Sequence, residues 1–147
     1  MKVPVAERKR ASQIRHGHAA LDQAFREGFV SISAMPPDNS TRNMFSEAEF
    51  QSRNCTSSII NVGRGGVINE KDSGTALRNR DIAGAATNVF EQWPATKSYS
   101  PLLDETILNL VLNPHVAWLS SKTIQCTIAT AEPNIEGFVA GKPHNLA

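Results

Sequence analysis

A glycine-rich turn that carries an arginine follows a β-branched, apolar segment. Residues 60–70 read INVGRGGVINE, so a predicted strand opens into the turn that holds Arg64. The glycines let backbone approach a ligand closely, and a guanidinium suits a carboxylate because its planar fork pairs with two oxygens at once. The turn is neither a GxGxxG fingerprint nor a P-loop. Arg64 is therefore a candidate carboxylate-binding residue; an ordinary surface arginine in a turn is the alternative.

A histidine follows the end of another predicted strand, in the sequence NPHVAW that contains His115. Histidine titrates near neutral pH, so at a strand end it suits proton transfer. A lone histidine is more often structural, and spacing alone does not decide between the two roles. His16 and His18 have the spacing of a metal-binding pair, but no third ligand follows them. We therefore expect no metal site.

A third candidate is the loop NVFEQWPAT, residues 88–96, which follows a run of small residues. It reads as a strand that runs out into a loop with Trp93 and Pro94 at its rim. Loops at strand ends are where α/β proteins keep their chemistry. The segment is thus expected to be an active-site loop, and the tryptophan in it requires an explanation.

The elements that must position these residues alternate between strands and helices. Strands are predicted over residues 3–6, 29–34, 58–62, 84–90 and 108–113, and helices over 18–28, 46–53, 69–79 and 120–141. Ser46 and Glu49 have the spacing of a capping box at the start of the second helix. This alternation is typical of a parallel α/β sheet, and no linker divides the chain into two domains.

Two helices contain residues that disfavour them. Pro133 lies inside the last predicted helix, where proline removes a hydrogen bond and costs about 3 kcal/mol. That helix is therefore expected to kink or to form two pieces. Ser73 and Gly74 stand where the third helix should present an apolar residue and a good helix former.

Composition is that of an ordinary globular domain. The 147 residues are 40% hydrophobic and 20% charged, with a net charge of +1, so nothing favours nucleic acid or an anionic membrane as a partner. There is no apolar run of membrane-spanning length and no secretory signal. The two cysteines, Cys55 and Cys126, match no metal or redox spacing. A reducing, cytoplasmic setting is expected.

Several segments together resemble one enzyme family. INVGRGGVINE, DIAGAATNVFEQWP, SPLL, NLVLNPHVAW and NIEGFVAGKPHNL occur in this order over nearly the whole chain. They resemble the C-terminal part of the D-isomer-specific 2-hydroxyacid dehydrogenases. The tryptophan in PHVAW is similar to that of the glycerate dehydrogenase/hydroxypyruvate reductase branch.

The resemblance implies an α/β fold, a partial Rossmann-type doubly wound parallel sheet without its first strand and glycine-rich turn. It also implies hydride transfer between NAD or NADP and a small 2-keto or 2-hydroxy acid such as glyoxylate or hydroxypyruvate. Arg64 would bind the substrate carboxylate, and His115 would exchange the proton with the substrate hydroxyl. Glu7 would hold the ribose hydroxyls, whereas the neighbouring Arg8 would favour a 2′-phosphate, so NAD and NADP both stay open. The other cofactor-contacting residues implied are Pro36, Val62, Gly63 and Asn88, with Arg64 and His115 beside them.

The chain departs from the family pattern at three places. Asn88 replaces an aspartate that faces the nicotinamide; it keeps the shape and one acceptor oxygen but loses the charge. Trp93 replaces the glutamate that pairs with the histidine, and an indole offers one N–H donor and no acceptor. Met35 lies where the family has the cysteine of an H-C-P sequence. Because the carboxylate would stabilise the protonated imidazole, its loss is expected to weaken His115 as a proton donor.

The chain also starts at the strand that carries Glu7, so the preceding strand, the GxGxxG turn and most of the substrate domain are absent from it. Residues 1–147 are interpreted as a truncated NAD(P)-binding domain whose final part, about 120–147, runs toward an absent substrate domain. Weak or absent activity of the chain alone is expected. A non-catalytic role is the alternative, as a homodimer or as a partner of a full-length paralogue through the exposed sheet edge; a decayed gene fragment is another.

Overall fold

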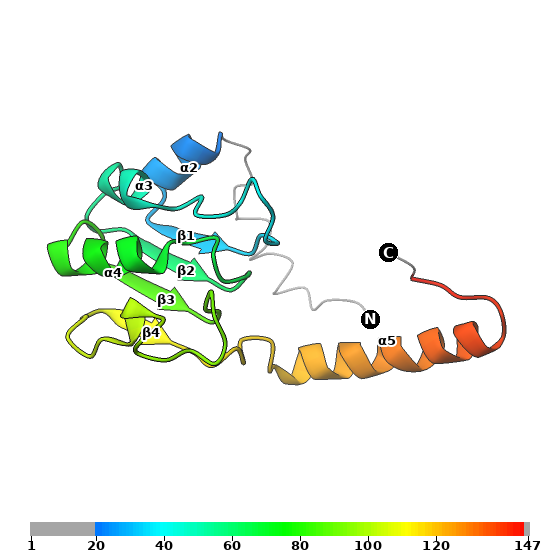
Figure 1. Cartoon of the computed structure of the whole chain (residues 1–147). Coiled ribbons are helices and arrows are strands. Elements are labelled where there is room, and N and C mark those ends of the chain that lie inside the picture. The colour runs from blue at the N-terminus through cyan, green and yellow to red at the C-terminus, as the bar shows by residue number, and fades with distance from the viewer. Residues whose placement is uncertain (1–19, 146–147) are drawn as a thin grey trace.

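The computed structural model describes residues 20–145 (Figure 1). The predicted strand over residues 3–6, Glu7 and the pair His16 and His18 lie outside this range. The elements in chain order are α2 (Leu21–Glu27), β1 (Val30–Ser33), α3 (Glu47–Gln51), β2 (Ser58–Asn61), α4 (Glu70–Asn79), β3 (Gly84–Thr87), the 3₁₀ helix η1 (Pro101–Leu103), β4 (Leu110–Leu112) and α5 (Ser121–Val139).

The four strands form one parallel sheet in the order β1-β2-β3-β4. Parallel strands need crossover connections, which α3, α4 and η1 with their loops provide. The prediction of a parallel α/β sheet is confirmed, although β3 and β4 are shorter than the residue pattern suggested. Because all four strands run the same way, their carboxyl ends lie along one edge of the sheet.

One face of the sheet is covered by α2, α3, α4 and η1, which contact one another in a row (Figure 1). The core between sheet and helices contains Phe50, Ile59 and Val67, each at most 1% exposed. Arg53 closes this core at one end, 7% exposed, with its guanidinium 4.1 Å from the centre of the Phe25 ring. Burial lowers the pKa of Arg53, and side-chain and carbonyl oxygens satisfy its N–H groups.

The opposite face of the sheet is apolar and open. One row of cross-strand partners on this face consists of Ile32, Ile60, Ala86 and Val111. Ile32 is 63% exposed and Val111 is 65% exposed. Parallel sheets are normally covered on both faces. Within residues 20–145, this second face has no covering layer.

Local sequence signals set the starts of α3 and α4. The Glu49 carboxylate accepts hydrogen bonds from the Ser46 backbone N–H at 2.9 Å and from the Ser46 hydroxyl at 2.7 Å. The predicted capping box is therefore confirmed. At α4, the side chain of Asn69 accepts from the backbone N–H of Asp72 at 3.0 Å.

The small residues of α4 have a packing role, which corrects their interpretation as weaknesses. Ser73 and Gly74 are both buried on the side of α4 that faces η1 and the loop after it. A Cβ added to Gly74 would lie 3.3 Å from Cδ1 of Ile107 and 3.8 Å from a methyl carbon of Leu102. Glycine is therefore suited to this position, because it lets the two segments approach closely.

The last helix is one continuous element that runs through Pro133, so of the two predicted alternatives, a kink or two pieces, the second is wrong (Figure 1). No residue of α5 is buried, and water can therefore hydrate the carbonyl that proline leaves without a donor. The helix extends away from the sheet (Figure 1). No helix among residues 20–145 has the length and apolar character needed to cross a membrane.

Candidate functional site

The predicted site residues follow the carboxyl ends of neighbouring strands. Pro36 comes after β1, Arg64 after β2, Asn88 after β3 and His115 after β4. All four therefore lie at the same edge of the sheet, which is where open α/β sheets bind their ligands. Glu7 lies outside the described residues. The structure describes no cluster of three or more metal-binding side chains within residues 20–145.

The buried side chain of Asn61 shapes the turn that carries Arg64. Its Nδ2 donates to the backbone oxygen of Arg64 at 3.0 Å, and its Oδ1 accepts from the backbone N–H of Gly63 at 3.2 Å. Asn61 is 3% exposed, so both of its bonds are protected from water. The arginine thus projects from a fixed turn instead of a loose loop.

The glycines of this turn are required because neighbouring loops pack closely against its backbone. A Cβ on Gly63 would lie 2.6 Å from the backbone oxygen of Met35, and one on Gly65 would lie 2.0 Å from that of Phe90. Gly66 has a φ of 81°, which favours glycine. The turn is therefore clamped between the loops that follow β1 and β3, and its glycines serve loop packing directly.

Arg64 itself is available to a ligand. Its side chain is exposed, and its Nη1 donates to the backbone oxygen of Gly63 at 2.9 Å. None of the ion pairs between described residues involves Arg64. A guanidinium without an acidic partner keeps most of its donors free for a carboxylate.

The loop after β3 brings Trp93 to His115. The two rings stack with their centres 6.1 Å apart and an angle of 29° between their planes, and Phe90 meets Trp93 edge-on at 5.5 Å. No hydrogen-bonded carboxylate faces the imidazole of His115 among residues 20–145. The loop after β3 therefore contacts the histidine through Trp93.

The backbone around His115 is held by two asparagines. Asn113 Oδ1 accepts from the N–H of Val116 at 3.0 Å, and Asn88 Oδ1 accepts from the N–H of Ala117 at 2.9 Å. His115 has a φ of 62°, a conformation that non-glycine residues rarely adopt. Asn88 therefore uses its side-chain oxygen to anchor the histidine loop.

Two residues that position the Trp93 loop were not singled out by sequence reasoning. The Arg42 guanidinium forms an ion pair with Glu91 at 2.5 Å, and the backbone N–H of Glu91 donates to the Glu70 carboxylate at 2.6 Å. These partners are 49 and 21 residues apart, so no local spacing indicates the contacts.

The comparison with protein families agrees with this geometry. Residues 1–117 match the model of the D-isomer specific 2-hydroxyacid dehydrogenase, NAD binding domain. The glycerate dehydrogenase of Methylorubrum extorquens is 32% identical over 130 residues, which cover 88% of this chain and 41% of that protein.

Solved structures give the same result. A D-isomer specific 2-hydroxyacid dehydrogenase family protein from Aeromonas salmonicida superposes with a TM-score of 0.71 and 31% identity, over 85% of this chain and 39% of that one. The NADPH-dependent glyoxylate/hydroxypyruvate reductase of Sinorhizobium meliloti, in complex with NADP and sulfate, has a TM-score of 0.68 and 28% identity, over 84% and 39%. The chain thus spans about two fifths of the length of these proteins. It belongs to the D-isomer specific 2-hydroxyacid dehydrogenase family.

Proposed function

We propose that this chain carries the substrate-binding arginine and the proton-transferring histidine of an NAD(P)-linked oxidoreductase for small 2-keto and 2-hydroxy acids. Glyoxylate and hydroxypyruvate are the substrates suggested by the names of its relatives. The observation that supports the proposal best is the guanidinium of Arg64, which pairs with no carboxylate among residues 20–145 and is held at the sheet edge where His115 also lies.

In this proposal Arg64 pairs with the substrate carboxylate and the adjacent C2 oxygen. This interaction would hold the reacting carbon in a fixed orientation at the end of β2. An imidazole nitrogen of His115 would give a proton to the C2 oxygen during reduction and take it back during oxidation. The Trp93 ring, stacked on the imidazole, would shield one face of His115 from water.

The described residues fit a nicotinamide dinucleotide at this edge. Val62 is 38% exposed and Pro36 is exposed, so both present apolar surface beside the turn of Gly63 and Arg64. Asn88 would contribute its N–H donors, and Glu7 its carboxylate to the ribose hydroxyls. The cofactor would supply or accept the hydride, and Arg8 beside Glu7 leaves NAD and NADP as equal candidates.

We also infer that the chain alone has weak or absent activity. Trp93 removes the carboxylate partner of His115, and acid–base assistance is typically worth roughly 10²- to 10⁴-fold in rate. Residues 1–147 would be the NAD(P)-binding portion, with residues from about 120 onward directed to a substrate domain outside this chain. The exposed cysteines Cys55 and Cys126 are both free, which is compatible with the reducing, cytoplasmic setting that we propose.

The experiment is a binding and turnover assay on the purified chain. NADH and NADPH would be titrated separately, and their oxidation would be followed with glyoxylate and with hydroxypyruvate. Arg64→Gln should abolish the response to 2-keto acids, while Arg26→Gln on the exposed surface of α2 should not. Turnover comparable to that of full-length relatives would contradict the inference of weak activity.

A non-catalytic role is the second candidate. The observations that favour it are the open apolar face of the sheet and the position of β1 at its edge within the described residues. Under this alternative neither nucleotide nor 2-keto acid binds, and the chain instead forms a complex. Failure of both nucleotides to bind would overturn the enzymatic proposal.

A further inference from the structure

We propose that Glu70 is a positioning residue for proton transfer by His115, and that it acts through the loop after β3. Its carboxylate holds the backbone of this loop two residues before Trp93, and the Trp93 ring stacks on the imidazole. Arg42, in the loop after β1, adds a second contact to the same loop. This role rests on the proposed function, because it concerns how the histidine of that site is kept in place.

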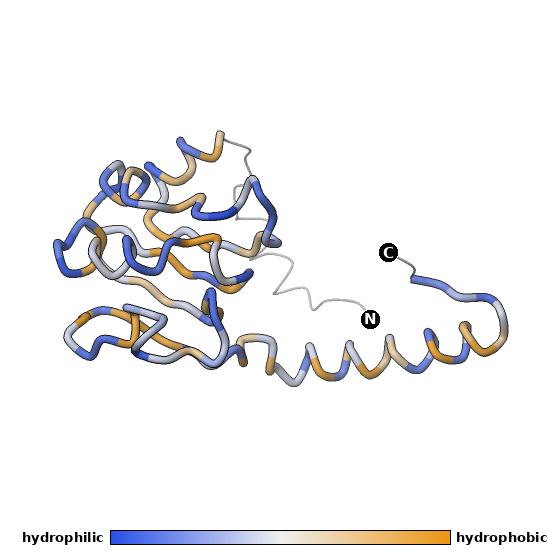
Figure 2. The backbone as a smooth tube through the Cα atoms, in the orientation of Figure 1, coloured by the Kyte–Doolittle hydropathy of each residue, from blue (hydrophilic) through white to orange (hydrophobic). Residues whose placement is uncertain are grey.

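The loop after β3 has little apolar surface that could hold it in place. Residues 91–99 include no buried side chain. Figure 2 shows hydrophobic positions along the strands and a hydrophilic stretch in this loop. Burial of apolar side chains is the main force that fixes a segment in a folded protein. Because residues 91–99 lack such burial, polar contacts with neighbouring segments must determine where Trp93 lies.

One of these contacts ties the loop to the start of α4. The backbone N–H of Glu91 donates to Oε1 of Glu70 at 2.6 Å, across 21 positions of the sequence. Glu70 is the first residue of α4, and the cap formed by Asn69 fixes the start of this helix. Hydrogen bonds to an ionised acceptor are shorter and stronger than those between neutral groups. The carboxylate therefore fixes the main chain at Glu91, close to Trp93.

A second contact ties the loop after β3 to the loop after β1. The carboxylate of Glu91 pairs with the guanidinium of Arg42 at 2.5 Å. The neighbouring Asn43 donates its backbone N–H to the carbonyl of Gly66 at 2.7 Å, which joins the loop after β1 to the turn that carries Arg64. The loops after three strands are thus fastened to one another at the edge where the candidate site lies.

The two contacts differ in what they can contribute. The side chains of Arg42 and Glu91 are 64% and 45% exposed, and exposed ion pairs contribute little because water and salt screen them. Glu70 is half-buried and restrains a backbone group, which has no side-chain rotamers to lose when it is bound. Glu70 is therefore the main restraint on the loop, and Arg42 is the lesser one.

The same loop also touches the turn that carries the arginine. A Cβ added to Gly65 would lie 2.0 Å from the backbone oxygen of Phe90 and 2.5 Å from the backbone nitrogen of Glu91. The turn and the loop therefore pack backbone against backbone. Since Arg64 projects from this turn, the bond of Glu70 keeps the loop of Trp93 in register with the residue that binds the substrate in the proposed function.

The loop reaches the histidine through aromatic rings. Phe90 is 6% exposed and meets Trp93 edge-on, with the ring centres 5.5 Å apart. Trp93 is 48% exposed, so Phe90 covers only part of its ring, and the position of the indole depends on the backbone that carries it. The indole then stacks on the imidazole of His115 at 6.1 Å. A shift of the loop is thus transmitted to the imidazole.

The imidazole depends on this contact because its own loop fixes only the backbone. The bonds from Asn113 and Asn88 hold the backbone N–H groups of Val116 and Ala117, both on the C-terminal side of His115. Proton transfer requires a ring nitrogen within about 2.6–3.2 Å of its partner atom. A displacement of about 1 Å can cost roughly 10²-fold in rate. The restraint that Glu70 provides should therefore affect the rate of proton transfer.

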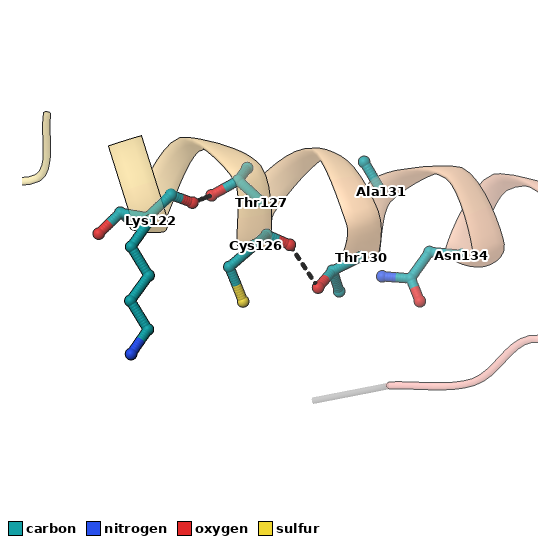
Figure 3. Close-up of a pocket in the computed structure, with 7 residues that line it drawn as sticks. Lys122, Cys126, Thr127, Thr130, Ala131 and Asn134 are labelled. Atoms are coloured by element: carbon teal, nitrogen blue, oxygen red, sulfur yellow. Dashed lines mark hydrogen bonds between the residues drawn. The ribbon is translucent and has the colours of Figure 1, made fainter. Parts of the chain in front are cut away.

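The hollow on the flank of α5 offers no alternative group for this chemistry (Figure 3). Thr127 and Thr130 donate their hydroxyls to backbone oxygens one turn earlier in the helix, at 2.9 and 2.8 Å. Neither a histidine nor a carboxylate is among the residues that line it. Proton transfer near neutral pH is therefore assigned to His115 at the strand ends.

The first test observes the contact between Trp93 and His115 without any turnover. A protonated imidazole quenches the fluorescence of an indole that it touches. The chain has two tryptophans, so Trp118→Phe leaves Trp93 as the only one. In this background, emission should fall as the pH is lowered through the range in which imidazole titrates. His115→Gln removes the imidazole and gives the baseline.

Substitution of Glu70 then tests the restraint. Glu70→Ala should abolish most of the quenching, whereas Glu70→Gln should retain it, because glutamine keeps an acceptor oxygen for the Glu91 N–H. Glu47→Ala is the matched control: Glu47 is the first residue of α3, and its side chain accepts only from Gln51 in its own helix. Circular dichroism checks that each variant keeps its fold. Quenching that is unchanged in Glu70→Ala would overturn the proposal.

Arg42→Gln is a second variant that does not depend on the folding of Glu70→Ala. It should remove part of the quenching, while Arg26→Gln, which breaks an exposed ion pair on α2, should remove none. Equal quenching in these two variants, together with a Glu70→Ala chain that does not fold, would also overturn the proposal.

Kinetics separate positioning from substrate binding. In the reduction of hydroxypyruvate by the full chain, Glu70→Ala should lower kcat roughly 10-fold or more and leave KM within about twofold, because Asn61 still holds the turn of Arg64. A rise in KM with an unchanged kcat would overturn the role. A wild-type chain that shows quenching dependent on Glu70 but no turnover would contradict the proposed function and support the restraint.

Discussion

At the scale of single residues, the contact between Trp93 and His115 has the clearest chemical consequence. The indole stacks on the imidazole and accepts no hydrogen bond from it. Aromatic stacking fixes the orientation of the ring, but a carboxylate would also stabilise its protonated form. In this chain the Trp93 ring orients the imidazole of His115, but no carboxylate among residues 20–145 stabilises its protonated form. Substitutions of Trp93 can therefore test the two effects separately.

We predict that Trp93→Glu accelerates reduction of hydroxypyruvate roughly 10²- to 10⁴-fold. The measurement is best made in a chimaera in which this chain replaces the matching part of the glycerate dehydrogenase of Methylorubrum extorquens. Trp93→Gln is the matched control, because it removes the indole and adds no charge. Equal rates for the Glu and Gln variants would contradict a role for the carboxylate.

A second prediction concerns Asn88, whose Oδ1 holds the Ala117 N–H at 2.9 Å. Asn88 is 6% exposed, whereas Ala117 is exposed, so the loss of Asn88 removes one partly shielded hydrogen bond from the histidine loop. Asn88→Ala should lower the free energy of unfolding by about 0.5–1.5 kcal/mol, measured by urea denaturation. Asn79→Ala, at the exposed end of α4, should change it by less than about 0.5 kcal/mol. Equal effects of the two substitutions would contradict the anchoring role.

At the scale of elements, Asp104 links α4 to the loop after η1. Its carboxylate accepts from the N–H and the hydroxyl of Thr106 at 2.9 and 2.8 Å, and it pairs with Arg78 at 2.5 Å. The bonds from Thr106, followed by that from Arg78, lower the pKa of Asp104 from 3.8 to about 2. The ionised carboxylate is thus favoured in the folded protein over the unfolded one.

This pKa gives a stability prediction with a defined sign. The contribution of Asp104 is complete above its unfolded pKa of 3.8 and is lost as the pH falls through about 2. Asp104→Asn should therefore unfold at lower urea than the wild type near neutral pH, with a difference that shrinks as the pH falls from 3.8 toward 2. Asparagine keeps an acceptor oxygen for Thr106, so this substitution tests the effect of removing the negative charge. A difference that is constant with pH would exclude the ionisation of Asp104 as its cause.

Most elements could be predicted from local patterns, and the exceptions have physical reasons. The capping box of Ser46 and Glu49 is a local signal, and it gave the start of α3 correctly. The role of Gly74 could not be predicted, because it depends on Ile107 approaching from 33 residues away in the sequence. Similarly, solvent exposure allows α5 to continue through Pro133, and exposure is a property of the fold.

In the candidate site, too, local patterns predicted some features, and others depend on the folded chain. Local patterns indicated that Arg64 and His115 follow strands, but only the family resemblance related Trp93 to the histidine. The pair of Arg42 and Glu91, which positions the loop, required the folded chain. These segments meet at one edge because the strands before them are neighbours in the sheet. The order of the strands cannot be read from any one segment of the sequence.

At the scale of the whole molecule, the described residues form two layers, a parallel sheet and the helices on one of its faces, whereas a doubly wound fold has helices on both faces. Helices cover one face of the sheet, while the other face exposes Ile32 and Val111. Parallel sheets of α/β proteins are normally covered on both faces, and the chain spans about two fifths of the length of these relatives.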